Sequence, residues 1–145
     1  MNATLEQPVG HSRSAFLQMC DDVGFTETEV RHMSEDTRNQ IPFPPGEGKG
    51  VEVRPSDIEG KGLFTKKHFT KGDLIAPAAI AGMRTPAGRY TNHSDHPNAY
   101  FICGATGRVM MVAKQNLYPD IELTVDYRQS REAASMAYQI LNGAH

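Results

Sequence analysis

Ten consecutive residues, 89–98, form the densest group of polar side chains in this sequence that could take part in chemistry. They read Arg-Tyr-Thr-Asn-His-Ser-Asp-His-Pro-Asn and offer hydrogen-bond donors and acceptors in both directions. Pro97 forces a turn and apolar runs follow it, so we expect the segment to be held inside a fold. Buried polar groups have to be paired, and a ligand rich in hydrogen-bonding edges is one way to pair them. Alternatively, Asn92 and Asn98 satisfy their own backbone in turns.

The spacing His93-x-x-His96, with Asp95 between the two histidines, has to be weighed as a metal site. A further ligand would have to be Cys103 or His68, and the sequence has no closely spaced cysteine pair of the zinc type. We therefore predict that no metal is bound.

A glycine pair precedes the polar segment, in Gly60-Lys61-Gly62. It is not a dinucleotide-binding fingerprint, because the third glycine and the helix that should follow are both absent. Such a pair either makes a tight turn between strands or lets the backbone approach a ligand closely. The pair alone does not decide between the two.

A second block follows the polar segment at residues 119–127, which read Pro-Asp-Ile-Glu-Leu-Thr-Val-Asp-Tyr. A tyrosine after an apolar strand commonly packs its ring in the core. Tyr127 is therefore either a core residue or a phenol that serves a site.

Taken in chain order, residues 60–62, 89–98 and 119–127 resemble motifs of the SET-domain family of protein lysine methyltransferases. Residues 89–98 are similar to the family motif Arg-Phe-x-Asn-His-Ser-x-x-Pro-Asn, with Tyr90 in place of Phe. Residues 119–127 are similar to the family block Gly-Glu-Glu-Leu-Thr-x-Asp-Tyr, with Asp120 and Ile121 in place of the first Gly-Glu.

The resemblance implies a mainly β fold of the SET type (a β-clip of small sheets), in which the C-terminal block forms a pseudoknot near the Asn-His-Ser segment. It also implies an S-adenosylmethionine-dependent protein-lysine N-methyltransferase, with Tyr127 as the catalytic residue. The cofactor-binding residues that it implies are Lys61, Gly62, Leu63, Arg89, Asn92, His93 and Tyr127, and Tyr90 is expected to contact the substrate.

One part of the family pattern is missing. Only 29 residues lie between Gly62 and Asn92, where SET enzymes have an insert that forms one wall of the substrate groove. The chain has only residues 74–84 and a turn at 85–88 there. We expect helices from residues 14–38, or a second subunit in a homodimer, to supply the wall. The alternative is a catalytically weak or inactive SET-fold module that binds S-adenosylmethionine or a peptide.

Composition and charge limit the classes of partner. A chain of 145 residues is expected to form one domain with a core. Residues 1–48 carry three basic and eight acidic groups, and residues 49–128 carry eleven basic and eight acidic groups. The first part is either a solvated acidic arm or an arm complementary to the core. The positive excess in the second part is too small to predict nucleic-acid binding, and the expected partner is a protein with an exposed lysine.

The sequence shows no sign of membrane insertion or of a disulfide framework. The longest apolar run, from Leu74 to Met83, is short and broken by Pro77. The N-terminus lacks the order of a signal peptide. The two cysteines lie far apart, which is typical of a reducing compartment. We therefore expect a soluble, cytoplasmic protein.

Pattern and turn residues predict three parts: an acidic helical extension with a Pro/Gly linker at 1–48, a SET domain at 49–128 and a C-terminal helix within 129–145. Residues 1–10 are expected to be disordered. Helices are predicted at 14–23, from a capping box at 26–29 through about residue 38, and at 129–141 with Ala133, Met136, Ala137 and Ile140 on one face. The predicted strands are Val51–Arg54, Leu63–Thr65, Asp73–Ala76, Tyr100–Cys103, Arg108–Ala113 and Glu122–Val125, with a hairpin turn at 104–107.

Overall fold

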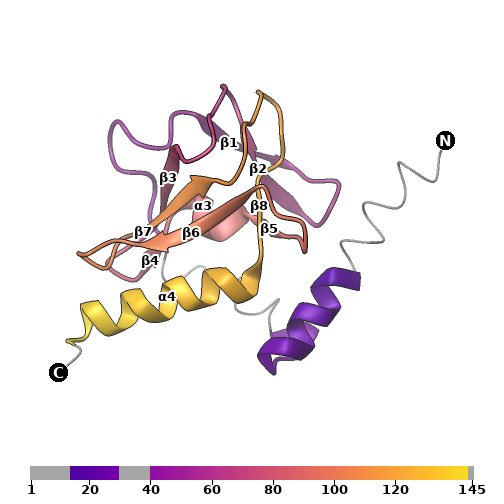
Figure 1. The fold of residues 1–145 in the computed structure, drawn as a ribbon, viewed down its shortest axis with the longest axis vertical. Helices are drawn as coiled ribbons and strands as arrows, with labels where there is room; N and C mark the ends of the chain where they lie inside the picture. The colour runs from indigo at the N-terminus through magenta and orange to yellow at the C-terminus, as the bar shows by residue number, and fades with distance from the viewer. Residues whose placement is uncertain (1–13, 30–39, 144–145) are drawn as a thin grey trace.

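The computed structural model describes residues 14–29 and 40–143, and its strands form three small sheets with helices at both ends (Figure 1). The first sheet is the hairpin of β1 (Val51–Pro55) and β2 (Lys61–Thr65), which pair antiparallel. Gly60 has φ of 47° just before β2, in the left-handed region that glycine adopts readily. The predicted mainly β fold of small sheets is confirmed.

The second sheet is the largest and has the strand order β4-β3-β7-β6. Pro77 lies inside its strand β3, where a proline cannot donate a ladder hydrogen bond, and the pairing with β7 shifts register near it. The predicted hairpin at 104–107 joins β6 to β7, which pair antiparallel. The strands of this sheet are β3 (Leu74–Ile80), β4 (Met83–Arg84), β6 (Ala99–Cys103) and β7 (Val109–Ala113).

The third sheet joins the two motif segments. Its strands, β5 (Asn92–His93) and β8 (Thr124–Val125), pair in parallel. A short helix, α3 (Pro86–Tyr90), leads into β5, so the turn predicted at residues 85–88 is the start of this helix. Thr85 caps it by accepting hydrogen bonds from two backbone N–H groups, and the proline at its first position has no N–H to leave unpaired.

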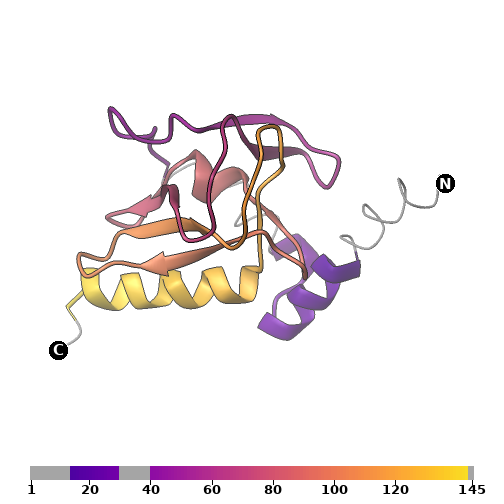
Figure 2. The same cartoon turned by 45° about the horizontal axis from the view of Figure 1, so that its top comes forward.

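The C-terminal helix, α4 (Tyr127–Leu141), packs along β6 and β7, as Figure 2 shows from the side. It begins two residues before the predicted start because the Asp126 side chain caps it, accepting a hydrogen bond of 2.9 Å from the N–H of Arg128. On the predicted apolar face, Ala133 and Ala137 are buried. The prediction is wrong for the other two residues of that face, Met136 and Ile140, which are exposed.

The N-terminal helix covers residues 14–23, as predicted, and ends at Gly24 with φ of 80°. The predicted capping box is present. The N–H of Thr26 donates to the Glu29 carboxylate at 2.9 Å, and the N–H of Glu29 donates to the Thr26 hydroxyl at 3.1 Å. The expected continuation of this second helix to Arg38, and the expected disorder of residues 1–10, lie outside the described residues.

The main core draws on all three sheets and on α4. Its most deeply buried members include Leu63, Met111 and Leu123. Glu122 forms only an isolated bridge with Phe64, so the predicted strand Glu122–Val125 is shorter than expected. The sheets and α4 hold β5 and β8 side by side, and α4 begins two residues after β8 ends. This arrangement positions the residues of the site.

Candidate active site

The parallel pair β5–β8 brings residues 89–98 and 119–127 together. Asn92 lies opposite Thr124, and the N–H of Ser94 donates to the carbonyl of Val125 at 3.0 Å. Asn98 links the same two segments, because its amide donates to the Glu122 carbonyl at 2.9 Å and accepts from the Thr124 N–H at 2.9 Å. Asn98 therefore links two segments of the chain; its side chain does not satisfy its own backbone.

The Asn92 amide ties the glycine turn to the C-terminal block. Its nitrogen lies 2.8 Å from a carboxylate oxygen of Glu122, 3.1 Å from the Ser56 hydroxyl and 3.1 Å from the Glu59 carbonyl. The Ser56 hydroxyl lies 2.7 Å from the same Glu122 oxygen. The three sequence stretches that resemble one family thus meet at a single carboxylate.

Glu122 also explains one glycine of the pair. A Cβ built on Gly62 would overlap the Glu122 carboxylate, so this position needs the absence of a side chain. Lys61 is exposed, whereas Leu63 is fully buried in the core. Of these three predicted cofactor residues, Gly62 and Leu63 have clear packing roles.

His93 lies beneath the start of α4 and is 3% exposed. Its Nδ1 accepts a hydrogen bond of 3.0 Å from the N–H of Tyr127, so the proton of the neutral ring belongs on Nε2. Burial lowers the pKa of His93, although the carboxylates of Asp126 and Asp95 act to raise it. His93 is therefore a neutral ring that orients the first turn of α4.

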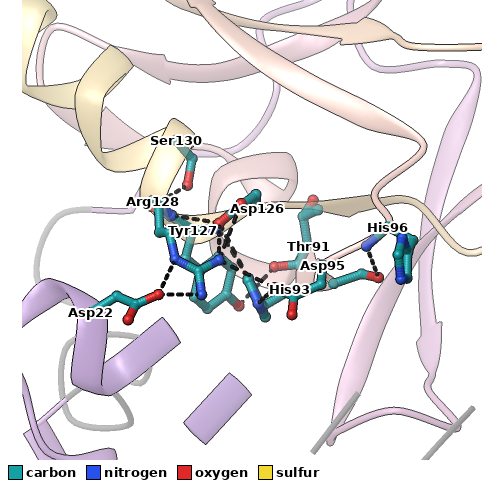
Figure 3. A network of polar contacts seen from close by, with 10 residues as sticks. Asp22, Thr91, His93, Asp95, His96, Asp126, Tyr127, Arg128 and Ser130 are labelled. Carbon is teal, nitrogen blue, oxygen red and sulfur yellow. Dashed lines mark hydrogen bonds and ion pairs between the residues drawn. The ribbon is translucent and has the colours of Figure 1, made fainter. Parts of the chain in front are cut away.

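Tyr127 is the first residue of α4, and its ring contacts the rings of His93 and Phe16, with centroids 5.2 Å and 6.4 Å away. Its hydroxyl donates to the carbonyl of Thr91 at 3.0 Å (Figure 3). Burial raises the pKa of Tyr127 to about 12, against the charges of Arg84 and Arg89. At neutral pH this side chain is a protonated phenol with a fixed orientation, so it does not act as a base.

A cavity of about 390 Å³ lies beside Tyr127, a volume typical of ligand sites. Its lining is mostly apolar, with three arginines, Arg84, Arg89 and Arg131. Met19, Val23 and Phe25 from the N-terminal segment form part of the lining. The expectation that residues 14–38 supply a wall beside Tyr127 thus agrees with the placement of residues 14–29, and residues 30–39 lie outside the described part.

Two buried side-chain nitrogens in the described part of the chain lack a hydrogen-bond partner, Arg89 Nε and His93 Nε2. The nearest acid to His93 Nε2 is Asp95, whose carboxylate oxygen lies 3.4 Å away without forming a hydrogen bond. Both nitrogens belong to predicted cofactor residues. Unpaired buried polar atoms are rare in proteins and call for a ligand or water.

The structure separates the predicted site residues into two groups. Arg89 and Tyr127 line the cavity, whereas the turn Lys61–Leu63, Asn92 and His93 do not, although the His93 ring packs against Tyr127. Tyr90, the predicted substrate residue, does not line it either, and its ring lies 4.8 Å from the Arg89 guanidinium. Sequence reasoning missed Arg128, whose position after Tyr127 gives no signal. It also missed Glu122, which matches the family block at a position to which the resemblance assigns no role.

No group of three His, Cys, Asp or Glu side chains within residues 14–29 and 40–143 is arranged to hold a metal ion. The same residues contain no helix with the length and apolar character that a bilayer crossing requires.

Residues 78–128 match the family model of the SET domain. This range includes the polar segment and the block that ends in Tyr127. Among solved structures, the chain is similar to a Plasmodium falciparum protein described as a proposed histone methyltransferase. The identity is 22%, the alignment covers 55% of this chain and 93% of that chain, and the TM-score is 0.46, which supports no functional conclusion. No curated protein matches the chain.

Proposed function

We propose that the protein is an S-adenosylmethionine-dependent protein-lysine N-methyltransferase, because residues 78–128 match the family model of the SET domain, a family whose members are generally methyltransferases. We place the SET domain at residues 49–128, with residues 1–48 and 129–145 as additions. The proposed substrate is a protein with an exposed lysine, and the proposed catalytic residue is Tyr127.

One observation carries this proposal. Two unpaired buried nitrogens lie near Tyr127: Arg89 Nε belongs to a residue that lines the cavity, and His93 Nε2 belongs to a ring of β5 that packs against Tyr127. A ligand with a carboxylate would pair with the guanidinium of Arg89, and a ligand acceptor would pair with His93 Nε2. These residues fit S-adenosylmethionine, which has both a carboxylate and ring nitrogens.

When bound, S-adenosylmethionine supplies a methyl group on a sulfonium. Little new charge is created as the methyl group moves to a neutral amine, so the protein has mainly to align the reacting atoms. Tyr127 suits this task, because its hydroxyl proton is committed to Thr91 at 3.0 Å and its ring is packed on both sides. A phenol that donates one hydrogen bond still has lone pairs to accept weak C–H···O contacts.

A target lysine also has to lose its proton, since its reference pKa is about 10.4. The cavity favours the neutral amine because its lining is mostly apolar, and burial disfavours the charged ammonium.

The remaining proposed cofactor contacts are Asn92 and the turn Lys61–Leu63. The Asn92 amide is already paired with Glu122 and Ser56, and the Leu63 side chain is buried. We propose that these residues meet the cofactor through their backbone. A cytoplasmic location and a homodimer remain predictions.

Transfer of a radiolabelled methyl group from S-adenosylmethionine to lysine-rich proteins tests the proposal. We expect Tyr127→Phe to reduce transfer by about 100-fold, the scale of losses from misplaced reacting groups. Tyr138→Phe, an exposed tyrosine on the same helix, is the matched control and should transfer normally. Cofactor binding without transfer in the native chain would instead support a binding module.

A further inference from the structure

The N-terminal helix packs directly on the proposed catalytic residue. Met19 and Cys20 are 1% and 3% exposed. They form a small hydrophobic cluster of their own, separate from the main core, with Phe16, Val23, Phe25 and Tyr127 packed against it. Tyr127 packs against both this cluster and the main core, so the segment 16–25 meets the main core at Tyr127 and shields part of its ring.

Arg128 on α4 binds this segment by charge. Its guanidinium contacts the Asp22 carboxylate at 2.6 Å and 2.7 Å, and it also contacts Asp95 and Asp126, each at 3.1 Å (Figure 3). Although burial acts to lower it, the pKa of Arg128 is raised by its hydrogen bonds to Asp22 and Asp95. One side chain thus ties the N-terminal helix to the polar segment and to the cap of α4.

Arg131, one turn further along α4, forms a second attachment. Its guanidinium donates to the Val23 carbonyl at 3.1 Å and lies 4.9 Å from the centre of the Phe25 ring. Because Val23 is the last residue of the N-terminal helix, this contact holds the helix end and the following turn against α4. Arg131 itself lines the cavity.

The cavity depends on this arrangement. Met19, Val23 and Phe25 line it together with Ala78 and Ala79 of β3 and Tyr127 of α4. Without the N-terminal segment, the side of Tyr127 that faces Phe16 would be open to solvent, and a desolvated site for a neutral amine would be lost.

We infer that residues 16–25 form one wall of the target site, and that Arg128 and Arg131 are positioning residues that hold this wall against Tyr127. The inference rests on the proposed function only for the nature of the target, a side chain with an apolar stem. The wall has to stay docked for the site to exist. It is not a lid that must open to admit the target.

Docking of the wall can be measured without an activity assay. The chain has two cysteines, so Cys103→Ser leaves Cys20, a buried residue of the wall itself, as the single reporter for alkylation by iodoacetamide. We expect slow alkylation in this background, and a roughly 2- to 5-fold faster rate with Asp22→Asn, the scale of a partly exposed ion pair. Asp21→Asn removes the same charge from the adjacent position of the helix and should leave the rate unchanged. Fast alkylation of the parent chain, or equal rates for the two variants, would overturn the inference.

Occupation of the site is tested with 8-anilinonaphthalene-1-sulfonate, an anionic aromatic probe that suits an apolar cavity with three arginines. We expect saturable binding that weakens at least about tenfold in Val23→Trp, which fills the cavity. Leu17→Trp, on the exposed side of the same helix, should bind the probe normally. Equal binding by the two variants, or no binding by the native chain, would contradict the inference that residues 16–25 form a wall of the cavity.

Kinetics separate the wall from the proposed function. If the chain transfers methyl groups, Val23→Trp should raise KM for the protein substrate about tenfold, whereas Leu17→Trp should leave it unchanged. If Asp22→Asn raised the activity, residues 16–25 would be a lid that has to open, and the inference of a docked wall would be refuted. If the chain transfers no methyl group while the alkylation and probe results are as expected, the proposed function fails and the wall remains.

Discussion

The two sides of the β5–β8 pair differ in how completely their polar groups are paired. On one side, Glu122, Asn92 and Ser56 form a closed hydrogen-bonded cluster that leaves no room beside Gly62. On the other side, Tyr127 lies beside a cavity where Arg89 Nε has no partner. Residues of one motif therefore have different roles: those on the paired side hold the strands in register, whereas the unpaired side has the space and the unsatisfied groups for a ligand.

The largest effect on stability is expected on the paired side. Asn92→Leu keeps the approximate volume but leaves the Glu122 carboxylate without its amide donor, and we expect a loss of about 3 kcal/mol in the free energy of unfolding. Urea denaturation measures this loss. The matched control is Asn116→Leu, an exposed asparagine that accepts one hydrogen bond from the N–H of Lys71, and it should cost less than about 1 kcal/mol. Equal losses would mean that the cluster around Glu122 does not hold the strands.

A smaller loss is expected from Gly62→Ala, because the new methyl group overlaps a carboxylate that Ser56 and Asn92 hold in place. We expect about 1–3 kcal/mol of destabilisation in the same denaturation experiment. Gly104→Ala, where a Cβ would meet only the Arg108 carbonyl at 3.4 Å, serves as the control. If Gly62→Ala folded normally but failed to bind S-adenosylmethionine, the glycine would belong to the cofactor site and not to the structural side of the β5–β8 pair.

On the unpaired side, a substitution should affect cofactor binding more than stability. Arg89→Met removes a buried nitrogen that has no partner, so we expect less than about 1 kcal/mol of change in the free energy of unfolding. The same substitution should weaken the binding of S-adenosylmethionine about tenfold or more, as calorimetric titration would show. Arg108→Met, which loses an ion pair with Glu47 on another surface, should leave binding intact. A large loss of stability with normal cofactor binding would place Arg89 on the structural side.

The mildest effect is expected from pH, through His93. Burial lowers its pKa below the value of the unfolded chain, so the unfolded state takes up a proton first as the pH falls. Stability should therefore be complete above about pH 6.5 and decline below it. Thermal unfolding between pH 7.5 and 5.5 measures the decline, and His93→Asn should reduce it. A midpoint that does not change with pH in the native chain would contradict a buried neutral ring.

Local signals in the sequence predicted much of this fold. The helix at 14–23, the capping box at Thr26 and the hairpin at 104–107 follow from stop, cap and turn residues that act over a few positions. The short pair β5–β8 could not be derived from such signals, because its strands are far apart in the chain and too short to show periodicity. Only the family resemblance placed these two segments close together.

The candidate site was predicted less completely. The resemblance gave Arg89, His93 and Tyr127, which the structure brings to the unpaired side. It could not give Arg128 or Asp22, because an ion pair between residues 106 positions apart leaves no pattern in one sequence. The resemblance also could not show that the Glu122 carboxylate accepts a hydrogen bond from Asn92 and fills the space beside Gly62, because both depend on side-chain packing.

Calorimetric titration of S-adenosylmethionine into the 145-residue chain shows whether the unpaired side binds the cofactor. We predict saturable binding of one cofactor per chain, with a dissociation constant below about 1 mM, equivalent to at least about 4.1 kcal/mol. We also predict that bound cofactor raises the midpoint of thermal unfolding. If the folded chain does not bind cofactor at millimolar concentration, the unpaired side is not a cofactor site, and the motif residues serve the architecture alone.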